Sequence, residues 1–177
     1  MSSNIINLLW ESFLETILMV GVSGGLGAAI GIPLGVFLFV TSPKGIMPKP
    51  YVNRIIGTVV NAVRSTPFII LLVAIIPFTR LIVGSSIGTV AAIVPLTIAA
   101  APLIARLVET SLREVDKGLI EAAQSMGATN TQIICKVLIP EAMPGILAGL
   151  TIAFVALVGS SAMAGAVGGG GLGDMGI

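Results

Sequence analysis

Residues 121–140 read EAAQSMGATNTQIICKVLIP, the longest polar interruption in an otherwise strongly apolar sequence. The segment carries a spaced pattern of Glu-Ala-Ala, a single glycine, and an aliphatic-x-aliphatic-Pro ending. The positions that fill the pattern are Glu121, Ala122, Ala123, Gly127 and the run Val137-Leu138-Ile139-Pro140. Because apolar stretches lie on both sides of it, the arrangement of the whole chain depends on which side of a membrane this segment faces.

The composition excludes an ordinary soluble domain. Of the 177 residues, 55% are hydrophobic and only 10% are charged, whereas globular proteins carry about 25% charged residues. A polytopic membrane protein is the class that fits. The chain has one cysteine, Cys135, and no histidine, so an internal disulfide and histidine-based metal or acid–base chemistry are excluded. We expect no metal site and no catalytic residue.

Four apolar stretches are long enough to cross a bilayer as helices, which takes about 20 residues each. We expect one transmembrane domain over residues 1–177, with a cytoplasmic coupling loop at 109–144 and spans at about 14–40, 55–78, 87–108 and 145–167. Pro67 falls within the second span, where we expect a kink. The predicted fold is an all-α polytopic membrane bundle.

Glycines recur every fourth residue in the first span. They form two rows, Gly21/Gly25 and Gly27/Gly31/Gly35. Small residues one turn apart allow a second helix to approach closely, so the first span is predicted to pack inside the bundle.

The basic residues define an orientation. Of the nine Lys and Arg residues, only Arg80 falls in the connection between spans two and three; the others lie in or beside the connections at 41–54 and 109–144. Positive residues mark the cytoplasmic side. The N-terminus is therefore predicted outside and the polar loop in the cytoplasm.

The polar loop itself is predicted to be ordered. Residues 119–126 favour a short helix, which Gly127 can end in the left-handed conformation. Thr129 and Gln132 have the spacing of a capping box, so a second helix is expected over 131–139. Such a loop could dock on a cytosolic partner. The simpler alternative is a loop that only connects two spans.

In the docking interpretation, Glu121 orients the helix through hydrogen bonds or a basic partner residue. Ala122 and Ala123 permit close packing against the partner. In the connecting-loop interpretation, Glu121 is a solvated charge.

The pattern resembles the EAA loop of the membrane subunits of binding-protein-dependent ABC importers. More narrowly, the chain is similar over essentially its whole length to the permeases of methionine importers. The stretches that carry this resemblance are NAVRSTPFIILL (61–72), IPFTRLIVGSSIG (76–88), AAIVPLTIAAAP (91–102), GLIEAAQSMGAT (118–129) and GSSAMAGAVGGGGLG (159–173).

The resemblance implies a type I ABC importer permease in the bacterial inner membrane, working as a homodimer with two ATP-binding subunits. An external substrate-binding lipoprotein would deliver methionine, with the D and L forms both left open. ATP and Mg²⁺ would bind the partner subunit, and this chain would be neither an enzyme nor a nucleic-acid-binding protein. The coupling residues would be Glu121, Ala122, Ala123 and Gly127.

Two features depart from the family pattern. The motif usually ends Ile-x-Leu-Pro, whereas here residues 137–140 read Val-Leu-Ile-Pro; the changes are conservative. Family members also continue into a fifth membrane helix after the glycine-rich stretch. A fifth helix is therefore expected from the resemblance but is missing from this sequence, which is either a truncated copy or only part of the protein.

Near the outer end of the fourth span, Met163 lies among small residues. A flexible thioether facing a second copy of the chain could gate a narrow pore, and packing in the core or against lipid is the simpler alternative. Ser160 and Ser161 could offer hydroxyls to the pathway or bond back to their own helix.

The residues alone leave two other classes of function open. A proton- or sodium-coupled carrier, or a channel, needs no ATP, but carriers of that kind place ionisable or unwound sites at mid-membrane. Glu15 and Arg64 lie near the span boundaries instead, where snorkelling or helix-end pairing is favoured. An assembly scaffold without transport activity is the third alternative. The chain contains no G-x-x-x-x-G-K-[ST] motif, so ATP would have to bind another subunit.

Overall fold

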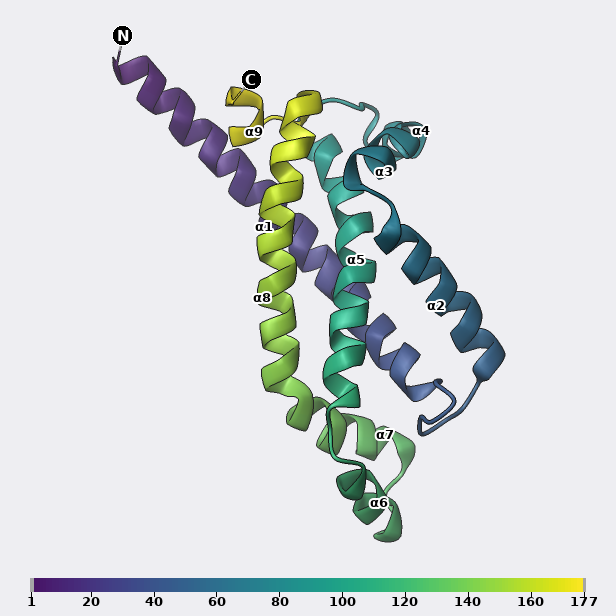
Figure 1. The fold of residues 1–177 in the computed structure, drawn as a ribbon. Coiled ribbons are helices and arrows are strands. Elements are labelled where there is room, and N and C mark those ends of the chain that lie inside the picture. Colours follow the sequence, from purple (N-terminus) through teal and green to yellow (C-terminus); the bar gives the residue numbers. More distant parts are fainter. Residues whose placement is uncertain (1, 177) are drawn as a thin grey trace.

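Three long helices form the body of the molecule in the computed structural model, which describes residues 2–176, with side chains from residue 5 onward. They are α1 (Ser2–Val40), α5 (Thr89–Arg113) and α8 (Ile139–Ala164). Helix α1 crosses α5 obliquely, and α8 runs alongside α5 (Figure 1). The described residues form helices and connections only, which confirms the predicted all-α class.

Glycines bring the backbones of α1 and α5 together. A methyl group added at Gly27 would lie 2.6 Å from Ala100 Cβ, and one added at Gly31 would lie 2.7 Å from Ala101 O. One turn further on, a methyl group at Gly35 would lie 2.5 Å from a backbone oxygen of α5. These separations leave no room for a side chain, so the predicted close approach is confirmed for this row.

The other predicted row does not make such contacts. A methyl group at Gly21 or Gly25 would meet nothing within 4 Å. The reason is helix geometry: residues 25 and 27 are two positions apart, which is about 200° around a helix of 3.6 residues per turn. The two rows therefore face opposite sides of α1, and the close-approach prediction was wrong for Gly21 and Gly25 within this chain.

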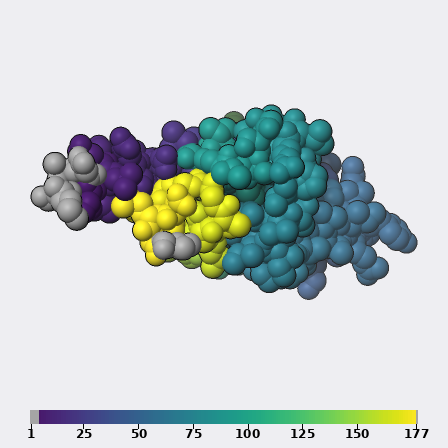
Figure 2. Space-filling model, turned by 90° about the horizontal axis from the view of Figure 1, so that it is seen from above, coloured from purple at the N-terminus to yellow at the C-terminus, as the bar shows by residue number. Residues whose placement is uncertain are grey.

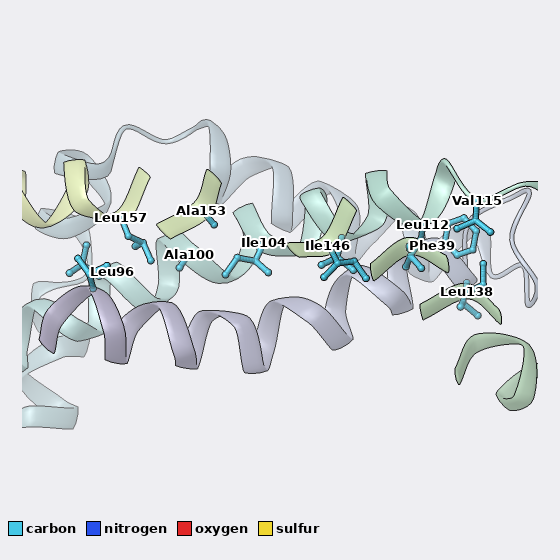
Figure 3. Packing of buried hydrophobic residues seen from close by; sticks show 14 of the residues in the cluster. Phe39, Leu96, Ala100, Ile104, Leu112, Val115, Leu138, Ile146, Ala153 and Leu157 are labelled. Atoms are coloured by element: carbon cyan, nitrogen blue, oxygen red, sulfur yellow. The ribbon is translucent and has the colours of Figure 1, made fainter. Parts of the chain in front are cut away.

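The core lies between the three long helices and continues to the end of the bundle near the short helices α6 (Lys117–Ser125) and α7 (Asn130–Ile133) (Figure 3). Leu96, Ala100 and Ile104 of α5 lie in the layer between α1 and α8. Toward the loop end, Phe39, Leu112 and Leu138 extend the same cluster. This packing gives the loop between α5 and α8 a rigid base.

The second predicted span, 55–78, is not a single kinked helix. The chain instead forms α2 (Pro50–Ser65), α3 (Phe68–Ala74) and α4 (Ile76–Val83), with a bend of 106° between α2 and α3. Pro67 disfavours the helical region for the residue before it, and Thr66 is extended, with φ −79° and ψ 125°. Proline thus breaks the helix here instead of bending it.

By length and composition, three helical segments could cross a membrane, or four if the bent pair of α2 and α3 counts as one span. The three are Ile5–Val40, Thr89–Arg113 and Asn130–Gly169. Helix α1 begins well before the predicted residue 14. The predicted loop at 109–144 is shorter than expected because α5 continues to Arg113 and α8 begins at Ile139.

The glycine-rich segment after α8 is held in place by hydrogen bonds to α1. A π-helical turn, η2 (Gly165–Gly169), leads to the short helix α9 (Leu172–Met175). The Gly171 amide donates to Glu15 Oε2 at 2.7 Å, and the Leu172 amide donates to Thr16 Oγ1 at 3.0 Å. Figure 2 shows this segment against α1. Glu15 therefore accepts a backbone hydrogen bond at the start of α9, which is helix-end pairing, one of the two alternatives that the sequence left open.

Candidate functional site

The segment that carries the Glu-Ala-Ala pattern forms helix α6 (Lys117–Ser125) below the three-helix body (Figure 1). Its N-cap is Asp116, whose carboxylate accepts a hydrogen bond from the Gly118 amide at 2.7 Å. A side-chain acceptor at this position satisfies one of the free amides of the first turn. The sequence therefore specifies where α6 begins.

Helix α6 ends at the predicted glycine. Gly127 has φ +78°, the left-handed conformation that glycine adopts most readily. Its amide donates to Gln124 O at 2.9 Å, and the Ala128 amide donates to Ala123 O at 3.1 Å. This pair of bonds is the Schellman motif, and it confirms the predicted role of Gly127 as the end of the helix.

The predicted capping box is also present, at the start of α7 (Asn130–Ile133). The Thr129 amide donates to Gln132 Oε1 at 2.9 Å, and the Gln132 amide donates to Thr129 Oγ1 at 3.4 Å. A π-helical turn, η1 (Ile134–Leu138), then joins α7 to α8 without an intervening loop. Ile133 and Leu138 are fully buried, so this connection is part of the core.

The four residues of the predicted coupling site divide into two groups. Glu121, Ala122 and Gly127 are exposed, whereas Ala123 is buried in the core cluster. The small size of Ala123 therefore serves packing within the chain. The small size of Ala122 has no such use in this chain. Met126 at the end of α6 is 83% exposed. It is an accessible apolar side chain that the sequence analysis missed, although its position beside Gly127 indicated a helix end.

A groove of about 200 Å³ separates α6 from the connection that follows α1. Lys44 lines one side, and Lys117 and Glu121 line the other. Within the part of the chain that the structure describes, the ion pairs involve Glu109 and not Glu121. The Glu121 carboxylate is thus exposed beside two lysines and is accessible to a partner.

A buried polar network fixes the end of α5 just above α6. Glu109 is 3% exposed and forms ion pairs with Arg106 and with Arg113, the latter at 2.6 Å. Arg106 Nη2 also donates to Gly57 O of α2 at 2.9 Å. The sequence analysis did not identify Glu109, although its spacing of three and four residues from the two arginines is the spacing of ion pairs on one helix face.

The candidate gate residues lie at the opposite end of α8 from α6 and α7 (Figure 1). Met163 is 46% exposed in this single chain. Ser160 Oγ donates to Ala156 O at 3.2 Å, and Ser161 Oγ donates to Val158 O at 2.8 Å. Both hydroxyl protons are thus used within α8, which is the alternative that the sequence left open.

Comparison with known proteins gives consistent matches. Residues 31–177 match the family described as binding-protein-dependent transport system inner membrane component. The chain is 58% identical over 171 residues to the protein named "Probable D-methionine transport system permease protein MetI" from Vibrio cholerae serotype O1, with 97% of this chain and 76% of that protein covered. It is 56% identical over 165 residues to the D-methionine transport system permease protein MetI of Salmonella typhi, with 93% and 76% covered.

A solved structure is similar to nearly the whole chain. It is described as inward facing conformations of the MetNI methionine ABC transporter, CY5 native crystal form. One of its chains matches with a TM-score of 0.97 and 55% sequence identity, over 99% of this chain and 82% of that chain.

Proposed function

This chain belongs to the family of binding-protein-dependent transport system inner membrane components, and on that premise we propose that it is the translocation subunit of an ATP-driven methionine importer. The substrate assignment comes from the relatives, whose names specify D-methionine. The coupling mechanism is argued from this chain's own residues. The single observation that carries it is an ordered helix, α6, that leaves Glu121 and Ala122 exposed.

Helix α6 is proposed to seat in a groove of an ATP-binding subunit. Ala122 is small enough for the partner's surface to approach the helix backbone. Glu121 would receive hydrogen bonds or a basic side chain from the partner, and Met126 adds an adaptable apolar contact at the helix end. The buried side of α6, at Ala123, stays attached to its own chain.

The movement would pass from α6 to the membrane helices through packed contacts. Val115 and Ala123 belong to the same buried cluster as Ile133 and Leu138, and η1 continues directly into α8. Closing the two ATP-binding subunits would therefore shift α6 and α8 together. Because ATP binds one arrangement of the complex better than the other, it would shift the equilibrium between inward-facing and outward-facing states.

The assembly that this mechanism needs contains two copies of this chain and two ATP-binding subunits, which bind ATP and Mg²⁺. This chain would bind no cofactor and carry no ATPase activity. An external substrate-binding lipoprotein would deliver the substrate on the side of α9. The α6 end would face the cytoplasm of a bacterium, because most basic residues lie in or beside the connections at 41–54 and 109–144.

Uptake of labelled methionine into vesicles tests the function. Vesicles reconstituted with the complete transporter and its binding protein should take up methionine only when ATP is supplied to the ATP-binding subunits. Glu121→Lys should abolish co-purification of the ATP-binding subunit, whereas Glu141→Lys, a matched change on the same side, should not. Uptake that follows a proton or sodium gradient and persists without ATP would contradict the proposal and favour a secondary carrier. Partner binding without uptake would favour a scaffold.

Cys135 tests the orientation. It is the single cysteine of the sequence and is exposed beside α7. A membrane-impermeant maleimide should label it in inside-out vesicles and not in intact spheroplasts. Labelling in spheroplasts would overturn the proposed cytoplasmic position of the loop.

A further inference from the structure

An apolar groove of about 480 Å³ lies on the side of the bundle where α1 ends. Its walls are the last two turns of α1, the connection that follows α1, and the chain from η1 into α8. Phe37, Met47, Ile134 and Ile139 are among the lining residues. The volume falls within the range of about 300–1,000 Å³ that is typical of small-molecule sites.

The walls offer almost no polar group to a ligand. Thr41 is one of two polar lining residues, and its hydroxyl is already used: it donates to Phe37 O at 2.7 Å and accepts from Asn53 Nδ2 at 3.0 Å. The other polar lining residue is Lys49, which is exposed. In the part of the chain that the structure describes, the Lys49 side chain forms no ion pair with an acidic residue. The groove therefore combines an apolar channel with one available cation.

The surroundings of Lys49 strengthen the positive charge. Lys44 lies in the same connection and Arg54 lies near the start of α2, and no acidic residue occurs anywhere between Glu15 and Glu109. Tyr51, the single tyrosine of the sequence, is 83% exposed beside Lys49. Exposed tyrosines are enriched at the level of lipid headgroups. Together these residues indicate that the mouth of the groove lies at the membrane surface.

We propose that this groove binds an anionic phospholipid of the inner leaflet, with one acyl chain along Phe37 and Met47 and the phosphate on Lys49. An anionic lipid is the occupant that matches both features, because its chain is apolar and its headgroup is negative. Basic residues at the cytoplasmic surface attract such lipids. A zwitterionic lipid carries the same phosphate, but the cation of its headgroup is unfavourable beside Lys44, Lys49 and Arg54. Inorganic phosphate matches only the lysine.

The site would hold a lipid against α1 and the η1 turn at once. Ile134 and Ile139 belong to the segment that joins α7 to α8. A bound acyl chain would therefore contact, from the membrane side, the segment through which α6 is proposed to move α8. The inference rests on the proposed orientation of the chain. It does not require transport, because lipid binding is measured on the purified transporter without ATP.

Native mass spectrometry of the purified transporter tests the site. We expect phosphatidylglycerol to bind in preference to phosphatidylcholine. Lys49→Gln should weaken phosphatidylglycerol binding about fivefold, the effect of removing one basic residue near a membrane surface. Met47→Trp should fill the groove and remove the tightest-bound lipid. The matched controls at the opposite end, Arg80→Gln and Leu81→Trp, should bind as the unaltered transporter does.

Several results would overturn the site. Equal binding of the two lipids, or an unchanged preference in Lys49→Gln, would show that the groove does not select the headgroup. An equal loss in Arg80→Gln would show that binding is not local. A protein occupant is tested with benzoylphenylalanine in place of Met47: a photo-cross-link from residue 47 to another subunit would mean that protein covers the groove. The thermal midpoint of each variant establishes that it is folded.

Discussion

Small residues have opposite environments in two parts of the molecule. On α1, Gly27 and Gly31 are pressed against the backbone of α5, so their small size is fully used within the chain. On α6, Ala122 is exposed on a helix whose two ends are fixed by a cap and a left-handed glycine. The contrast separates residues that build the bundle from a residue that is available to another protein. A bulky side chain should therefore destroy the fold at the first place and a partner contact at the second.

The largest effect is expected for Gly31→Leu. The new side chain would begin 2.7 Å from Ala101 O and 2.8 Å from Ile104 Cβ, so α1 and α5 would have to separate, and loss of the monodisperse transporter in detergent is expected. Gly25→Leu is the matched control because nothing lies within 4 Å of that position. Size-exclusion chromatography compares the two. Similar behaviour of both variants would contradict the packing described for α1.

A smaller loss of stability is expected for Glu109→Ala. The change leaves Arg106 and Arg113 without their shared carboxylate, and hydrogen bonds to charged groups contribute about 1.5–3 kcal/mol each. Arg113 is half exposed, so most of the effect should come from Arg106. The thermal midpoint should fall clearly for Glu109→Ala, less for Glu109→Gln, and little for the exposed Glu114→Ala. An equal fall of the thermal midpoint in Glu109→Ala and Glu114→Ala would mean that the ion-pair network of Glu109 does not fix the end of α5.

The third effect is confined to function. Ala122→Leu should lower ATP-dependent methionine uptake about tenfold, equivalent to about 1.4 kcal/mol of lost docking energy, because the leucine would hold the partner's surface away from α6. The thermal midpoint of the isolated permease should not change. Ala29→Leu, a size-matched change at an exposed alanine of α1, should leave uptake intact. A large fall in the midpoint of Ala122→Leu would mean that residue 122 is structural and would remove the contrast with α1.

Local signals predicted the loop well. Gly127 and the Thr129–Gln132 pair act through contacts between residues close in sequence, so their spacing was enough to predict a helix end and a helix start. The spans of α1, α5 and α8 follow from long apolar stretches. The predicted end of α1 at residue 40 was correct, whereas most other boundaries moved by several residues.

Features that depend on distant residues were not predictable in the same way. The two glycine rows look alike in sequence, and only the position of α5 distinguishes them. Pro67 could have kinked or broken the second span. Helix-end pairing was among the roles expected for Glu15, but its donor, the amide of Gly171, lies 156 residues away in the sequence and could not be predicted. The candidate coupling site was predicted as a unit, but the assignment of Ala123 to the core needed the position of η1.

Photocross-linking from the end of α6 tests the central proposal most directly. Met126 and Leu81 are both strongly exposed, at 83% and 85%, and lie at opposite ends of the bundle. With benzoylphenylalanine in place of each in the assembled transporter, illumination should join residue 126 to the ATP-binding subunit and leave residue 81 unlinked to it. A transporter that imports methionine with ATP yet gives no adduct between residue 126 and that subunit would contradict the proposal that α6 is the docking helix.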